Sequence, residues 1–132
     1  MKRVVLDLDG CLHWYYSGYT GLSPEDPPTP GALDFVHWLR EKGFEVVICT
    51  ARIKPDGTGA TEIREWLVKH SFPDDLVVTN TKFPAVLYVD DRGWRFDGNW
   101  NDIKFFLEGV NLKPGSWVDN HWRDGKEFKE VI

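Results

Sequence analysis

Two aspartates, Asp7 and Asp9, stand directly after an apolar run in the stretch "VVLDLDG". Residues two apart on an extended chain point to the same side, so both carboxylates would face one place. Carboxylates that lie so close repel each other unless a cation sits among them. Oxygen ligands suit Mg²⁺, and one carboxylate could attack an electrophile while the other moves a proton. The pair therefore indicates metal-assisted group transfer.

Further polar side chains occur where other apolar runs end or begin. Thr50 follows "FEVVIC", Asp90 and Asp91 follow "AVLYV", and Lys82 precedes that last run. A lysine can neutralise negative charge, and a threonine hydroxyl can donate to a phosphoryl oxygen. Together with the first two aspartates, these residues supply the parts of covalent phosphoryl transfer: a nucleophile, an acid–base group, a metal site and a positive clamp.

The elements that must position these residues alternate along the chain. Continuous apolar runs predict buried strands at 3–8, 44–50, 75–80 and 85–91, and a fifth strand is expected at 94–98. Helical spacing of apolar residues predicts helices at 29–43, 59–72 and 100–110, the last with Ile103, Phe106, Leu107 and Val110 facing inward. For the first helix we expect Thr29 as the N-cap, Pro30 at the first position and Gly43 just past the end.

This alternation of strands and helices predicts a parallel sheet with crossover connections. We predict one α/β domain over 1–132, doubly wound and Rossmann-like, with a core of about 1–110 and a C-terminal extension at 111–132. Ligands of such sheets bind outside the carboxyl ends of the strands. The rule brings the polar residues to one edge, although they are far apart in the sequence.

Composition and charge narrow the class of protein. The 132 residues suit one domain, and an apolar fraction of 42% is ordinary for a globular protein. No apolar run approaches the roughly 20 residues of a membrane-spanning helix, and the start of the chain lacks a signal-peptide pattern. We therefore expect a cytoplasmic protein with no membrane association. The net charge of −5 argues against extended nucleic-acid binding, and the two cysteines imply neither a disulfide framework nor a zinc site.

Four stretches, "DLDGC", "ICTAR", "TNTKFPA" and "YVDDRGWRFDG", resemble the four motifs of the haloacid dehalogenase superfamily in type, order and relative position. The resemblance covers roughly 1–110. It implies a Mg²⁺-dependent phosphatase in which Asp7 is the nucleophile and forms an aspartyl-phosphate. Asp9 would be the general acid and then the general base, Thr50 would bind the phosphoryl group, and Lys82 would steady the nucleophile.

The resemblance also implies the metal ligands. Asp7 and at least one of Asp90 and Asp91 would hold Mg²⁺, with Asp90 as the first choice, and the backbone carbonyl of Asp9 would complete the protein ligands. At the position after Gly10 the superfamily usually has Thr or Val, and this chain has Cys11.

Candidate substrate-binding residues lie around the first two motifs. Arg52 could touch a substrate phosphate, and pairing with a surface carboxylate is the alternative. His13 could reach a leaving group, or be a structural histidine. The full set of substrate-binding candidates is Gly10, His13, Thr50, Ala51 and Arg52.

Superfamily members often insert a cap domain, but the connections 11–29 and 51–81 are too short for one. The resemblance implies that a capless member acts on a large substrate that shields the site itself or borrows a lid. The expected substrate is a phosphate ester, either a small molecule or the phosphorylated end of a larger one. The other route is a lid from a neighbouring subunit, so a homo-oligomer stays an alternative. The aromatic residues of the first connection, namely Trp14, Tyr15, Tyr16 and Tyr19, either wall this exposed site or cover the sheet edge; "PEDPPTPG" reads only as a stiff lead-in to the first helix.

Two other classes of protein fit part of the pattern. A receiver-like phospho-acceptor module also combines acidic residues, a threonine and a lysine, but its phospho-accepting aspartate follows the third strand, where "DLVVTN" offers none. A non-catalytic relative that binds a nucleotide or a partner is the second alternative. The complete set of catalytic residue types argues against it.

Overall fold

The structure, a computed structural model, describes residues 2–109 of the chain. By its internal contacts the chain divides into two compact units, Met1–Asp91 and Arg92–Ile132. The first contains β1 (Arg3–Asp7), α1 (Ala32–Glu41), β2 (Glu45–Cys49), α2 (Ala60–Lys69), β3 (Val77–Thr79) and β4 (Leu87–Val89), and the second contains α3 (Trp100–Gly109). The boundary at about 110 between a core and an extension stays a prediction, because it falls where the described residues end.

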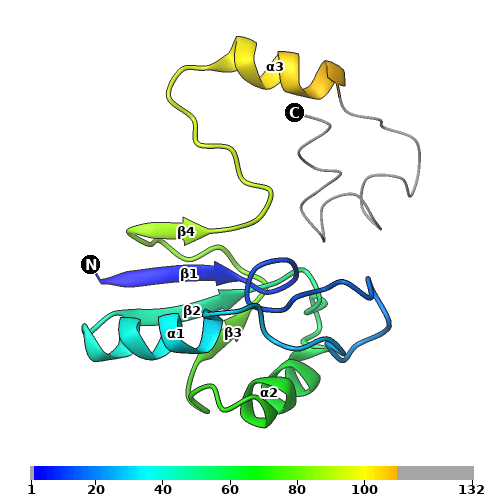
Figure 1. The fold of residues 1–132 in the computed structure, drawn as a ribbon, viewed down its shortest axis with the longest axis vertical. Helices are drawn as coiled ribbons and strands as arrows, with labels where there is room; N and C mark the ends of the chain where they lie inside the picture. Colours follow the sequence, from blue (N-terminus) through cyan, green and yellow to red (C-terminus); the bar gives the residue numbers. More distant parts are fainter. Residues whose placement is uncertain (1, 110–132) are drawn as a thin grey trace. The chain divides into compact units, whose positions relative to one another are not determined.

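The strands of the first unit form one parallel sheet in the order β3-β2-β1-β4 (Figure 1). The register of β1 runs from Arg3–Glu45 to Asp7–Cys49 on β2, and from Val4–Leu87 to Leu6–Val89 on β4. The predicted parallel α/β fold is therefore confirmed. Because β1 lies between β2 and β4, the strand ends that lead to Asp7, Thr50 and Asp90 are neighbours.

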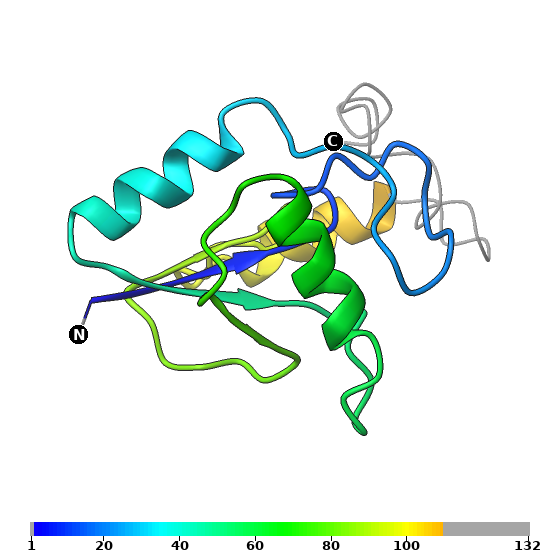
Figure 2. The same cartoon turned by 90° about the horizontal axis from the view of Figure 1, so that it is seen from below.

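Both crossover helices, α1 and α2, cover the same face of this sheet (Figures 1 and 2). The steps from β1 to β2 and from β2 to β3 go in one direction, and right-handed crossovers in one direction place their helices on one face. The connection from β3 to β4 returns across the sheet without a helix. Within residues 2–91 the helices therefore lie on one face of the sheet, and the doubly wound arrangement over the whole domain stays a prediction.

The apolar core lies between the sheet and these two helices. Its buried members include Val4, Leu6, Val46 and Ile48 from the strands, Val36 and Leu39 from α1, and Ile63, Trp66 and Leu67 from α2. Side chains alternate between the faces of a strand, so Val5 and Asp7 point to the opposite face from Val4 and Leu6. Asp7 is thus directed away from the helices.

The two ends of α1 differ in how well the sequence predicted them. Gly43 follows the helix with φ 82, the left-handed conformation expected of it. The predicted N-cap, Thr29, is wrong: the cap is Gly31 with φ 85, and no side chain caps the helix. The hydroxyl of Thr29 instead donates to the carbonyl of Cys11 at 2.7 Å, because it closes the loop that follows β1.

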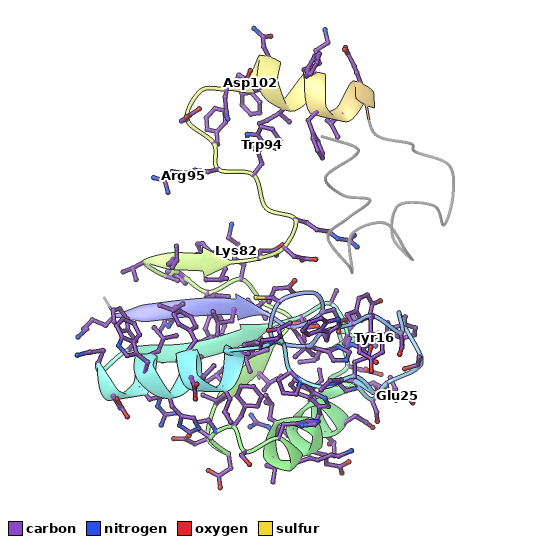
Figure 3. All side chains as sticks on the ribbon, in the orientation of Figure 1. Tyr16, Glu25, Lys82, Trp94, Arg95 and Asp102 are labelled. Carbon is purple, nitrogen blue, oxygen red and sulfur yellow. The ribbon has the colours of Figure 1, made fainter. Side chains whose placement is uncertain are left out.

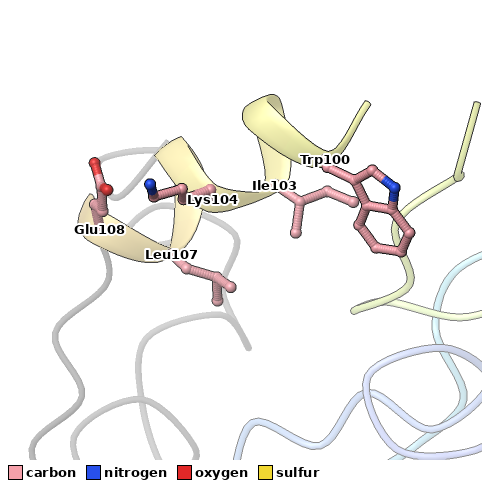
Figure 4. A pocket seen from close by; sticks show the side chains of 5 residues that line it. All are labelled: Trp100, Ile103, Lys104, Leu107 and Glu108. Carbon is pink, nitrogen blue, oxygen red and sulfur yellow. The ribbon is translucent and has the colours of Figure 1, made fainter. Parts of the chain in front are cut away.

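The second unit has no strand at 94–98, so the predicted fifth strand is wrong. Aromatic contacts join this segment to the helix, with ring centroids 5.4 Å apart for Trp94 and Phe106 and 4.4 Å apart for Phe96 and Trp100. Ile103 and Phe106 are half-buried as expected, Leu107 is exposed, and Val110 lies outside the described residues. Ile103 and Leu107 help line a shallow, mainly apolar pocket on α3 (Figure 4).

None of the helices in residues 2–109 has both the length and the apolar character that crossing a bilayer demands.

Candidate functional site

A tight turn carries the chain away from the end of β1. The carbonyl of Leu8 accepts the N–H of Cys11 at 3.1 Å and that of His13 at 2.9 Å, and the N–H of Gly10 donates to the carbonyl of His13 at 2.9 Å. Gly10 has φ 78, a conformation that glycine adopts at little cost. The turn therefore depends on a residue without a side chain directly after the Asp-x-Asp pair.

Three of the predicted metal ligands come together at this edge of the sheet. Carboxylate oxygens of Asp7, Asp90 and Asp91 all lie within 4.8 Å of one another. Burial, a hydrogen bond that protonated Asp7 donates to Asp91, and the charges of Asp90 and Asp91 raise the pKa of Asp7 from its ordinary 3.8 to about 8. Such crowding is what a bound cation relieves, and three carboxylates are hard oxygen donors of the kind that Mg²⁺ takes. The donor set fits the expected ion.

The raised pKa of Asp7 predicts how stability changes with pH. Between about pH 4 and about pH 8 the folded protein holds a proton on Asp7 that the unfolded chain has lost. The free energy of unfolding should therefore fall as the pH rises through this range, and added Mg²⁺ should reduce the fall by compensating the ionised carboxylates. Thermal unfolding at pH 5, 7 and 8.5, in EDTA and in Mg²⁺, measures both effects. The same slope in Asp7→Asn would contradict the assignment to Asp7.

Asp9 points to different partners from those of Asp7. Its carboxylate accepts the Nε–H of Arg52, at 2.9 Å from Oδ1 and 2.7 Å from Oδ2, and Oδ1 lies 2.8 Å from Nδ1 of His13. The Asp9 side chain remains 20% exposed, so it can still meet a ligand. Its carboxylate is not among the three clustered at the metal site, and metal ligation through its backbone carbonyl stays a prediction.

The other predicted residues lie around the same strand ends. Thr50 is buried, and its hydroxyl oxygen accepts the N–H of Arg52 at 3.1 Å, which leaves the hydroxyl proton available. Ala51 is exposed. Lys82, on the connection before β4 (Figure 3), lies over the ring of Tyr88 at 4.7 Å and makes no ion pair within the described residues. Tyr88 pairs with Val5, so Lys82 is on the sheet face of Asp7.

Arg52 is engaged inside the protein. Only 4% of it is exposed, and besides Asp9 it donates through Nη1 to the carbonyl of Gly21 at 2.9 Å. Its guanidinium lies 5.7 Å from the ring centroid of Tyr15 and 5.2 Å from that of Tyr19. Nη2 has no hydrogen-bond partner among the described residues. Arg52 thus pairs with Asp9, a residue of the candidate site, and not with a surface carboxylate. A contact between Arg52 and substrate stays a prediction.

The loop after β1 is closed and tied to α2. The N–H of Trp14 donates to the carbonyl of Pro27 at 3.0 Å, and the buried carboxylate of Asp26 accepts the N–H and the hydroxyl of Ser17 at 2.8 and 2.6 Å. The carbonyl of Asp26 accepts the indole N–H of Trp66 at 2.9 Å. Sequence reasoning missed Asp26, because the stretch "PEDPPTPG" suggests only a lead-in to the first helix. An acidic residue between prolines was the one sign that this stretch could hold a structural carboxylate.

The aromatic residues of this loop divide between the two interpretations. Tyr15 is 8% exposed and packs on His13 and Arg52, whereas Trp14, Tyr16 and Tyr19 are 37%, 51% and 57% exposed. The loop extends beyond the carboxyl ends of β1 and β2, with Tyr16 labelled on it (Figure 3). Tyr15 therefore fills space beside the site, and the other three are available to a ligand or a partner.

Gly59 supports the backbone of Arg52 from the N-terminus of α2. A Cβ at this position would lie 2.7 Å from the carbonyl oxygen of Arg52, and φ is +102. We expect Gly59→Ala to destabilise the protein by about 2 kcal/mol or more, from strain and steric clash together, and to displace Arg52. The matched control is Gly57→Ala, because Gly57 has φ +89 but nothing within 4 Å of the added Cβ. Urea denaturation compares the two, and equal losses would show that the contact with Arg52 contributes nothing.

Cys11 is a poor nucleophile in this setting. Burial and the nearby carboxylates, Asp7 foremost, raise the pKa of its thiol to about 12. The thiol contacts the carbonyl of Val89 at 3.7 Å. Cys11 therefore supplies no reactive thiolate at neutral pH.

The fold and this cluster define a small α/β protein with a four-stranded parallel sheet and an acidic site at the carboxyl ends of its strands. Comparison with protein-family models, curated proteins and solved structures gave no match in any of the three.

Proposed function

We propose that the protein is a Mg²⁺-dependent phosphatase of the haloacid dehalogenase superfamily, which hydrolyses a phosphoric monoester through an aspartyl-phosphate on Asp7. The observation that carries the proposal is the convergence of Asp7, Asp90 and Asp91 within 4.8 Å at the ends of β1 and β4, beside Asp9. Strands far apart in the sequence deliver the residue types that the chemistry needs to one edge of the sheet.

Each side chain has a task in the two half-reactions. A carboxylate oxygen of Asp7 attacks phosphorus while the bond from phosphorus to the ester oxygen breaks, and Asp9 gives that oxygen a proton. Asp9 then takes a proton from water as the water oxygen attacks phosphorus, which breaks the bond to Asp7 and releases inorganic phosphate. The hydroxyl of Thr50 donates a hydrogen bond to a phosphoryl oxygen.

Asp7, Asp90 and Asp91 would hold Mg²⁺, which, when bound, would neutralise charge on the phosphoryl oxygens. Lys82 would supply further positive charge from the sheet face that carries Asp7. The exposed aromatic residues of the loop after β1 would border an uncapped site, which suits a substrate that itself excludes water.

A phosphatase screen tests the proposal. Purified protein with Mg²⁺ is assayed against aryl phosphates, nucleotides, sugar phosphates and phosphorylated oligonucleotide ends, with Asp9→Asn and EDTA as controls. Hydrolysis that needs both Mg²⁺ and Asp9 supports the proposal. Binding of phosphate or nucleotide without turnover would favour the non-catalytic alternative, and no hydrolysis of any ester would overturn the enzyme proposal.

A further inference from the structure

We infer that His13 is a positioning residue that fixes the carboxylate of Asp9 for proton transfer, an inference that rests on the proposed function. His13 has an exposed fraction of 0%, so a substrate approaching from solvent does not meet it. It lies behind Asp9, with Nδ1 at 2.8 Å from Oδ1. This role replaces contact with a leaving group as the interpretation of His13.

The backbone decides which nitrogen of His13 carries the proton. The N–H of Asp26 lies 3.0 Å from Nε2, and a backbone N–H can only donate. Nε2 is therefore the acceptor, and the neutral imidazole carries its proton on Nδ1. Nδ1 then donates to Oδ1 of Asp9. A loop residue thus sets the direction of a hydrogen bond at the catalytic carboxylate.

Arg52 fixes the orientation of the Asp9 carboxylate. Its Nε–H is shared between both carboxylate oxygens, so Oδ1 receives two donors and Oδ2 receives one. Each carboxylate oxygen has two acceptor positions. Oδ1 is saturated, and Oδ2 keeps a position for the proton that is transferred. The geometry therefore assigns the acid–base role to Oδ2.

The surroundings keep the imidazole in place. The rings of Tyr15 and Trp66 meet it edge-on, with centroids 5.7 and 5.4 Å away. Asp26, which supplies the donor to Nε2, is itself held by Ser17 and by the indole of Trp66. Rotation of the His13 ring would break these contacts together, so the hydrogen bond to Asp9 is preorganised.

Two substitutions separate the two hydrogen bonds of His13. Asparagine places its amide near the position of Nδ1, so His13→Asn keeps a donor to Asp9 and loses the acceptor for Asp26. Glutamine reaches the position of Nε2, so His13→Gln keeps the acceptor and loses the donor. Both variants leave the nucleophile and the metal ligands intact, and unfolding curves show how much each destabilises the fold.

The measurement is kcat/KM for two esters with saturating Mg²⁺, because this constant covers only steps up to transfer of the phosphoryl group. Phenyl phosphate needs a proton on its leaving oxygen, whereas dinitrophenyl phosphate does not. For His13→Gln we expect a loss of about 30-fold with phenyl phosphate and less than about threefold with dinitrophenyl phosphate. For His13→Asn we expect losses below about fivefold with both, since the donor to Asp9 is kept.

The outcomes separate this inference from the proposed function. Equal losses of His13→Gln with both esters, or equal behaviour of the two variants, would show a merely structural histidine and overturn the inference alone. If the wild type hydrolyses neither ester, the proposed function fails. In that case ¹⁵N NMR of the histidines still decides the contact: a proton on Nδ1 of His13 supports the hydrogen bond to Asp9, and one on Nε2 refutes it.

Discussion

Replacing Asp7 with asparagine is expected to abolish the proposed phosphatase activity, with a fall in kcat of at least about 10⁴-fold. Removal of a covalent nucleophile costs this much because the remaining groups cannot supply an alternative bond to phosphorus. Asparagine has nearly the shape of aspartate, so the strand end and its neighbours should stay folded. The amide is also neutral, which suits a position where burial and Asp91 already favour the neutral form of Asp7.

Acid-quench trapping with labelled substrate measures this directly. The wild type should accumulate an acid-stable, hydroxylamine-sensitive phosphoenzyme, and Asp7→Asn should form none. Asp74→Asn serves as the matched control, because Asp74 is an exposed aspartate of the first unit that lies outside the cluster. Full activity in Asp7→Asn, or a phosphoenzyme that survives the substitution, would place the nucleophile elsewhere.

Replacing Asp91 with asparagine should change function and stability in opposite directions. Loss of a carboxylate ligand should weaken Mg²⁺ binding by at least about tenfold and lower activity at limiting Mg²⁺. In EDTA at pH 8.5 the same change should stabilise the fold by on the order of 1 kcal/mol, or about 4 °C in Tm, because one of the mutually repelling charges is gone. The charges and the hydrogen bond that raise the pKa of Asp7 come in part from Asp91.

Mg²⁺ titrations and thermal unfolding of Asp90→Asn and Asp91→Asn, with Asp74→Asn as control, test this pair of effects. The variant with the larger loss of Mg²⁺ affinity identifies which of the two carboxylates is the main ligand. A variant that binds Mg²⁺ more weakly and is also less stable in EDTA would indicate that the replaced carboxylate stabilises the fold by hydrogen bonding. Its charge would then not be destabilising.

The parallel sheet and the place of the acidic cluster could be predicted from local patterns. Continuous apolar runs specify strands buried in a sheet, and alternation with helical periodicity specifies crossovers. The chain order of Asp7, Thr50 and Asp90 after three such runs then suffices to place them at one edge. The left-handed conformation of Gly43 could also be predicted locally, because the end of a helix depends mainly on the residues of its last turn.

Other features depended on contacts across the fold. The face covered by α1 and α2 depends on strand order, and local patterns carry no strand order. Thr29 is not the cap because the helix begins only after Gly31, and the hydroxyl of Thr29 is oriented toward a carbonyl 18 residues earlier. The expected strand at 94–98 was wrong because its aromatic residues pack on α3 instead of pairing in a sheet.

The sequence alone determined which groups could do chemistry and near which strand ends they lie, because residue type and strand periodicity are properties of the chain itself. Only the tertiary structure decided how those groups divide. Asp7 lies with Asp90 and Asp91, while Asp9, two residues on, lies with Arg52 and His13. That division results from the turn at Gly10 and from a loop held through Asp26, whose long-range hydrogen bonds no local pattern specifies.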